Sequence, residues 1–191
     1  MSTAAWAPVS LAVVSAGAGH PRPTRLLADW VAEAVCRSLA AGGARAEVEV
    51  LELHRLAADL AQHSTYDRAS LDLREAIAAV VAADGLVVAT PVLAASPSEV
   101  FDSFFAVLGG GVLAGMPVLL ALNSSSDRQP PDTTQVIRGR LTDVHADPVP
   151  TIVVAGPADW PATAGSDAAR LRACIDQAAA ELAAAMRSHR R

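Results

Sequence analysis

The chain has 191 residues, of which 52% are hydrophobic and 18% are charged, and its formal net charge at pH 7 is -5. This length favours one domain with a sizeable core, and the composition excludes a disordered chain. The acidic balance argues against nucleic acid as the main partner, because a polyanion is bound by a concentrated basic face. No segment reaches the ~18 apolar residues of a membrane span, and the N-terminus lacks a secretory signal pattern, so we expect a cytoplasmic protein without a membrane partner.

Five short apolar runs along the chain have the character of β-strands. They are Leu11 to Val14, Ala46 to Leu53, Leu86 to Thr90, Val118 to Leu122 and Thr151 to Ala155. Four of them are continuous, which is typical of strands that are buried on both faces of a parallel sheet. The second run alternates glutamates with aliphatic residues, and this pattern indicates a half-exposed edge strand.

Apolar residues recur at helical spacing in the segments between these runs. The predicted helices cover residues 26–39, 73–81, 100–108, 171–182 and, less regularly, part of 127–145. The first and third end before glycines, which are typical helix stops. Strands that alternate with helices form βαβ units, whose right-handed crossovers give a parallel sheet with helices on both faces.

The pattern therefore predicts an α/β fold of flavodoxin-like type. With the alternating strand at an edge, the five strands fit a parallel sheet in the order 2-1-3-4-5, inside a three-layer sandwich. In such a sheet, ligands bind beyond the carboxyl ends of the strands, at the switch between strands 1 and 3. The loops that follow Val14, Thr90 and Leu122 are therefore the candidate site.

The first of these loops, Ser15 to Thr24, carries groups that suit a phosphate. A phosphate at a helix N-terminus is stabilised by unpaired backbone N–H groups and by the positive end of the helix dipole. The loop offers glycines for close backbone approach, two hydroxyls and two positive charges: Gly17, Gly19, Ser15, Thr24, Arg22 and Arg25. The same residues also fit a plain turn with Thr24 as a helix cap, so both interpretations stand. A dinucleotide fingerprint is not met, because Arg22 takes the place of its third glycine.

The cysteines and histidines carry no sign of metal binding or catalysis. Cys36 and Cys174 lie in Ala-rich helical patterns without C-x-x-C spacing, so we predict buried small hydrophobic residues rather than metal ligands or a disulfide. The histidines are scattered and show no pair at ligand spacing. The sequence therefore predicts neither a metal site nor a catalytic side chain.

Four segments together resemble the NADPH-dependent FMN reductase family, which is flavodoxin-like, and in particular its actinobacterial branch. The segments are SAGAGHPRPTRLLAD, AADGLVVATPVLAASPSEVFDSFFAVL, LAGMPVLLAL and VPTIVVAGPADW. The resemblance covers about residues 8–185, which we take as the core of a single domain over residues 1–191. It implies that the first loop holds the 5'-phosphate of FMN, the second lies against the isoalloxazine ring and the third borders the pyrimidine end of the ring.

The loop chemistry and the resemblance together give a set of candidate cofactor-binding residues. In the first loop they are Ser15, Gly17, Arg22, Thr24 and Arg25; in the second, Pro91, Val92, Leu93, Ala94 and Ser96; in the third, Asn123, Ser124 and Ser125. The family chemistry needs no side-chain acid or base, because NADPH or NADH gives a hydride to FMN and the protein holds the two rings face to face.

Several positions differ from the residues usual in the family. Leu93 and Ala94 replace an aromatic residue and an asparagine, Glu99 replaces a glycine, and Asp102 replaces a lysine. In the third loop, the usual Thr-Gly-Gly is replaced by Asn123, Ser124 and Ser125. These changes remove a stacking ring and add acidic groups near an anionic cofactor. Two functions therefore stay open: an NAD(P)H-dependent FMN reductase that can supply a partner monooxygenase, and a flavin-free subunit that supports an intact paralogue. In either case the resemblance implies a homodimer or a heterodimer with a related subunit.

Overall fold

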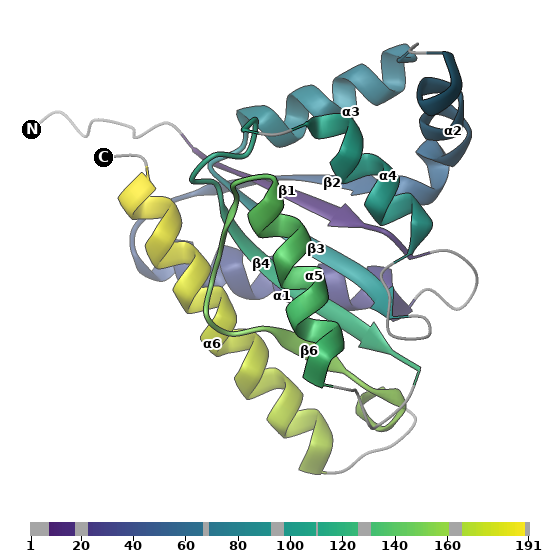
Figure 1. The fold of residues 1–191 in the computed structure, drawn as a ribbon. Helices are drawn as coiled ribbons and strands as arrows, with labels where there is room; N and C mark the ends of the chain where they lie inside the picture. Colours follow the sequence, from purple (N-terminus) through teal and green to yellow (C-terminus); the bar gives the residue numbers. More distant parts are fainter. Residues whose placement is uncertain are drawn as a thin grey trace, which may run out of the picture.

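The computed structural model describes residues 8–17, 23–66, 69–92, 98–109, 111–125, 131–160 and 166–189. In this part of the chain a parallel sheet lies between two layers of helices (Figure 1). Its strands are β1 (Val9–Ser15), β2 (Ala46–Glu52), β3 (Gly85–Val92), β4 (Pro117–Ser124), β5 (Asp147–Pro148) and β6 (Val153–Ala155). The sheet order is β2-β1-β3-β4-β5, and β6 also pairs with β4. The predicted flavodoxin-like α/β fold and its 2-1-3-4-5 order are confirmed.

Each face of the sheet carries its own hydrophobic core. The helices are α1 (Pro23–Ala41), α2 (Ala57–Tyr66), α3 (Leu71–Ala82), α4 (Glu99–Leu108), α5 (Pro131–Asp143) and α6 (Ser166–His189), with short 3-10 helices η1 (Leu53–Leu56) and η2 (Pro157–Asp159). Alternate residues of β1, β3 and β4 pack against α1 and α6 on one face and against α2 to α5 on the other. Because strand side chains alternate in direction, continuous apolar runs supply both cores at once.

The edge strand β2 is the one whose glutamates alternate with aliphatic residues, as predicted. It pairs with β1 alone, and Glu47, Val48 and Glu49 are exposed. The sequence did not predict η1 and α2, which follow this strand. Their buried residues Leu53, Leu56 and Leu60 have helical spacing, but the stretch around them is polar and short.

The opposite edge of the sheet is interrupted, whereas the sequence predicted one strand from Thr151 to Ala155. Pro148 pairs in register with Val118 and Val153 with Ala121, so this edge has two more residues than β4 between the two pairs. The Arg138 guanidinium donates to the carbonyl oxygens of Pro148 and Pro150, at 3.2 and 3.4 Å. The backbone N–H of Thr151 donates to Glu181 on α6 at 2.8 Å. Side chains of α5 and α6 thus bind backbone groups of this edge where its pairing with β4 is interrupted.

The two cysteines are less buried than predicted. Cys36 and Cys174 are unpaired and half-buried, because each lies between the buried and the exposed side of its helix. Burial, with a smaller contribution from Glu33 at Cys36, raises the pKa of both thiols. Both therefore stay protonated and inert near neutral pH.

Neither a membrane span nor a metal cluster is found in the described part of the chain. None of the helices described above is both long and apolar enough to cross a membrane. Within the same residues, no group of three or more His, Cys, Asp or Glu side chains could hold a metal ion.

Candidate functional site

The buried polar side chains of the described residues gather at the carboxyl end of the sheet. They are Ser15, Thr24, Thr90 and Ser124, with exposed fractions of 1%, 3%, 0% and 6%. They lie at or near the ends of β1, β3 and β4 and in the first turn of α1. Burying a hydroxyl costs free energy unless it finds a partner, so such residues are not placed by core packing alone. Their convergence marks this edge as the candidate site.

The end of β1 and the start of α1 approach each other closely. A Cβ atom added to Gly17 would lie 2.6 Å from Cβ of Thr24, which no side chain tolerates without a shift of the backbone. The N–H of Ala16 donates to the carbonyl oxygen of Ala89 on β3 at 2.8 Å, which holds the residue after β1 against β3. Glycine at position 17 therefore allows the first turn of α1 to close over the end of β1, with its free N–H groups at the candidate site.

Asn123 links the third loop to the first. Its Nδ2 group donates to Oγ1 of Thr24 at 3.4 Å, so the amide lies at the start of α1. Its Oδ1 atom is buried and has no hydrogen-bond partner among the described atoms. A buried acceptor without a donor costs free energy until a donor reaches it. Asn123 is thus arranged to accept a hydrogen bond from a ligand held between β4 and α1.

The second loop begins beside the third. Pro91 and Val92 at the end of β3 pair in register with Asn123 and Ser124 at the end of β4. Where the second loop ends, Ser98 caps α4: its Oγ atom accepts from the N–H of Phe101 and donates to the carbonyl oxygen of Ala16, both at 3.3 Å. Ser98 thus connects α4 to the first loop, a contact between residues 82 positions apart that the sequence did not indicate.

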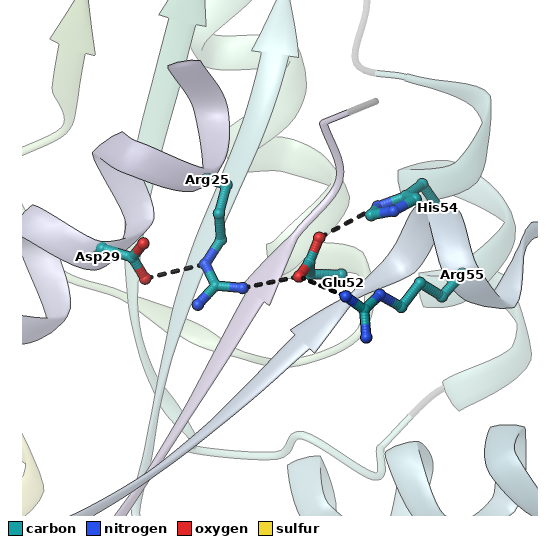
Figure 2. Close-up of polar contacts among 5 residues, drawn as sticks. All are labelled: Arg25, Asp29, Glu52, His54 and Arg55. Atoms are coloured by element: carbon teal, nitrogen blue, oxygen red, sulfur yellow. Dashed lines mark hydrogen bonds and ion pairs between the residues drawn. The ribbon is translucent and has the colours of Figure 1, made fainter. Parts of the chain in front are cut away.

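Arg25 is held by two carboxylates. Its Nε atom donates to Oδ1 of Asp29 and its Nη1 atom to Oε1 of Glu52, both at 2.9 Å (Figure 2). Glu52 also lies 3.5 Å from Nδ1 of His54 and 3.4 Å from Nη2 of Arg55. Glu52 is not among the predicted site residues, although it is the last glutamate of the alternating strand and therefore stands at the carboxyl end of the sheet.

The remaining predicted residues fall into two groups. Arg22, Leu93, Ala94 and Ser96 lie outside the described residues, and Ser125 is exposed after the end of β4. The structure brings together those that it describes: Ser15, Gly17, Thr24, Pro91, Val92, Asn123 and Ser124. The two unusual acidic residues lie on the first turn of α4, where Glu99 is exposed and Asp102 lies 3.7 Å from Nε of Arg140. The Arg140 charge therefore offsets that of Asp102.

The chain is similar to known proteins both in sequence and in structure. The sequence model of a family described as NADPH-dependent FMN reductase matches residues 9–161. No curated protein matches the chain. Among solved structures, an oxidoreductase from Corynebacterium diphtheriae is 36% identical, with a TM-score of 0.89, over 95% of this chain and 98% of that chain.

More distant structures share the same architecture. The apo form of an NADH:FMN oxidoreductase is 21% identical, with a TM-score of 0.72, over 90% of this chain and 88% of that chain. A flavodoxin, WrbA-like protein from Agrobacterium tumefaciens is 18% identical, with a TM-score of 0.59, over 96% of this chain and 99% of that chain. At these identities the likeness shows the fold, and the chemistry has to be argued from the site.

Proposed function

The chain belongs to the NADPH-dependent FMN reductase family, and from this premise we propose that it is an NAD(P)H-dependent flavin reductase that binds FMN at the carboxyl ends of β1, β3 and β4. One observation carries the proposal: the buried hydroxyls of the described residues converge there, at the start of a helix. Bound FMN would supply a ring that accepts a hydride from NADPH or NADH.

The residues at this edge fit the phosphate and the sugar chain of FMN. Free N–H groups at the start of α1 and the helix dipole favour a dianion, and Ser15 and Thr24 add hydroxyl donors. Gly17 leaves room for the backbone to approach. Oδ1 of Asn123 offers the acceptor that a sugar hydroxyl needs. We assign Ser15, Gly17, Thr24 and Asn123 to this end of the cofactor.

The ends of β3 and β4 are assigned to the flavin ring. Pro91 and Val92 lie side by side with Asn123 and Ser124, so the paired backbone of two strands reaches this edge. Holding the flavin and the nicotinamide in contact supplies the rate enhancement by orientation, so no side chain has to exchange a proton. We place Leu93, Ala94, Ser96 and Ser125 around the same ring, by family resemblance.

Purified protein titrated with FMN tests the proposal. We expect quenching of flavin fluorescence that saturates at one FMN per chain, and oxidation of NADPH or NADH only when FMN is present. A protein that neither binds added FMN nor oxidises either nucleotide contradicts the reductase function. That result would favour the alternative of a flavin-free subunit, to which the exposed Glu99 beside the site would contribute.

Arg22 is our candidate for a direct phosphate ligand. A guanidinium binds phosphate strongly when it contacts two oxygens at once. The variant Arg22→Ala should weaken binding of FMN while leaving binding of riboflavin, which lacks the phosphate, nearly unchanged. Equal FMN affinity in the variant and the wild type would remove Arg22 from the site.

We further propose that the protein works as a homodimer, or as a heterodimer with a related subunit, and passes reduced flavin to a monooxygenase or another acceptor. The proposal is supported by family resemblance. Light scattering coupled to size-exclusion chromatography gives the assembly directly, and a monomeric mass at micromolar concentration contradicts a stable homodimer.

A further inference from the structure

We propose that Glu52 is a positioning residue that holds both ends of the connection between β1 and α1, and that Arg25 acts on FMN affinity through Glu52 rather than by touching the phosphate. The inference rests on the proposed function, because it concerns the same FMN site. It assigns a role to a residue on the edge strand β2, which makes none of the predicted cofactor contacts.

Glu52 is joined to both ends of the connection. As the last residue of β2, it pairs in register with Ser15, the last residue of β1, and the connection starts there. Its side chain accepts from Arg25, in the first turn of α1, where the connection ends. One residue thus fixes where the chain leaves the sheet and where the helix begins.

The hydrogen bonds of Arg25 hold its guanidinium between two carboxylates. Asp29 lies one helical turn further along α1, and Nε of Arg25 donates to it at 2.9 Å. Figure 2 shows the guanidinium between Asp29 and Glu52. Two carboxylates already balance its charge, so a phosphate would have to bind the remaining N–H groups of a guanidinium that these pairs hold in place. A guanidinium that binds two carboxylates at once links the chain segments that carry them, and we call an arginine in this role a strut.

Burial makes the pair with Glu52 more than a surface ion pair. The Glu52 side chain is 10% exposed and that of Arg25 is 30% exposed, whereas Arg55, the other arginine near Glu52, is 69% exposed. A largely buried carboxylate needs close cationic partners, and removing one leaves a costly charge behind. Arg25 is therefore a closer and more buried partner of Glu52 than Arg55 is, and exposed Arg55 contributes little.

The functional consequence is that Ser15 and the first turn of α1 are in place before the ligand arrives. Binding groups that are already positioned lose less conformational entropy on binding, which raises the affinity without a new contact. The two roles of Arg25 predict opposite results for Glu52→Gln. If Arg25 is a strut, loss of the Glu52 charge loosens the connection and weakens FMN binding. If Arg25 is a phosphate ligand, the same change frees its charge and strengthens FMN binding.

The experiment measures dissociation constants for FMN and riboflavin in Glu52→Gln, Arg25→Ala and the double variant. We expect roughly three- to tenfold weaker FMN binding in each single variant, a smaller change for riboflavin, and a double variant no weaker than Arg25→Ala. The exposed pair of Arg37 on α1 and Asp176 on α6 supplies matched controls. Arg37→Ala and Asp176→Asn should leave FMN affinity unchanged.

Arg25→Lys gives a second and milder test. A lysine keeps the positive charge but replaces the planar fork with a single ammonium, so it cannot bridge two carboxylates in the same way. If Arg25 is a strut, Arg25→Lys should bind FMN nearly as weakly as Arg25→Ala does. If Arg25 is a phosphate ligand, Arg25→Lys should keep most of the wild-type affinity for FMN. Tighter FMN binding in Glu52→Gln, or additive losses in the double variant, overturns the inference alone. A wild-type protein that binds no FMN overturns the proposed function together with it.

Discussion

At the carboxyl end of the sheet, the hydroxyls of Ser15 and Thr24 and the unpaired Oδ1 atom of Asn123 lie buried around the start of a helix. At the amino end, described polar groups of Ser10 and Asp84 join β1 to the start of β3 instead. There the N–H of Ser10 donates to Oδ2 of Asp84, and the N–H of Asp84 donates to the carbonyl oxygen of Ser10, both at 2.8 Å. The carboxyl end thus leaves hydrogen-bonding capacity for a ligand, whereas the amino end uses its own to hold the strands.

Glycines at the two ends make the comparison testable, and the largest effect is expected from Gly17→Ala. The added Cβ would lie 2.6 Å from Cβ of Thr24, so the first turn of α1 must move. We expect FMN affinity to fall by at least about tenfold, because a small displacement of binding groups is costly. Overpacking should also reduce the free energy of unfolding by ~1 to 3 kcal/mol. FMN titration and urea unfolding measure the two effects.

Gly85→Ala is the matched change at the amino end. Its Cβ would lie 2.6 Å from Cγ of the buried Met186 on α6. We expect a similar loss of stability, ~1 to 3 kcal/mol, with FMN affinity unchanged in the folded protein. If the two variants lose FMN affinity equally, the carboxyl end is not distinguished from the amino end and the site is misplaced.

A smaller effect is expected from Thr24→Val, which keeps the shape of the side chain and removes its hydroxyl. The change takes away the acceptor of the Asn123 amide and a donor to the phosphate. We expect FMN binding to weaken about five- to tenfold, since one buried hydrogen bond contributes about 1 kcal/mol. Thr142→Val on α5, an exposed threonine that donates only to its own helix at Arg138, is the control for FMN titration. An equal loss in both variants contradicts a role for the Thr24 hydroxyl.

At the amino end of the sheet, α1 and α5 end with the same backbone hydrogen bonds but with a different residue at the left-handed position. After α1, Gly43 has a φ of 80°, and after α5, His145 has a φ of 61°. Both ends have the same pair of backbone hydrogen bonds. After α1, the N–H groups of Gly43 and Ala44 donate to the carbonyl oxygens of Ala40 and Leu39. After α5, those of His145 and Ala146 donate to the carbonyl oxygens of Thr142 and Leu141. This is the Schellman motif, in which glycine is favoured.

His145→Gly should therefore stabilise the protein. A side chain at positive φ costs free energy that glycine avoids, so we expect a gain of about 0.5 to 1 kcal/mol in the free energy of unfolding. Gly43→Ala should lose about 1 kcal/mol for the same reason. Urea unfolding measures both, and FMN affinity should stay constant. A destabilised His145→Gly variant would mean that the imidazole makes a contact worth more than the backbone strain.

The fold could be predicted from the sequence, and its strand order indicates where a ligand would bind, whereas the links between loops could not be predicted. Continuous apolar runs in β1, β3 and β4 report burial on two faces, and strand order then places the site by topology. The pair of Arg25 with Glu52 and that of Ser98 with Ala16 join residues far apart in the chain, so no local pattern signals them. The predicted fifth strand, Thr151 to Ala155, begins after β5, and the two residues of β5, Asp147 and Pro148, form no apolar run that could have signalled it.

The smallest effect on stability is expected at Glu181. Its carboxylate accepts hydrogen bonds from Thr151 at the interrupted edge of the sheet and contacts none of the candidate site residues described above. Partial burial raises the pKa of its carboxyl. Hydrogen bonds from the Thr151 hydroxyl and N–H and from Gln177 lower the pKa by more than burial raises it, so the pKa lies below its usual value. A lowered pKa adds stability above the unfolded pKa of about 4.3, and this stability is lost as the pH falls through the lower, folded value. Glu181→Gln should therefore unfold more easily than the wild type at pH 7, and the difference should vanish in the acid range. Glu33→Gln, an exposed glutamate on α1, controls for charge alone in urea unfolding at each pH. A difference between wild type and Glu181→Gln that persists at pH 3 would mean that the side chain acts through packing and not through its charge.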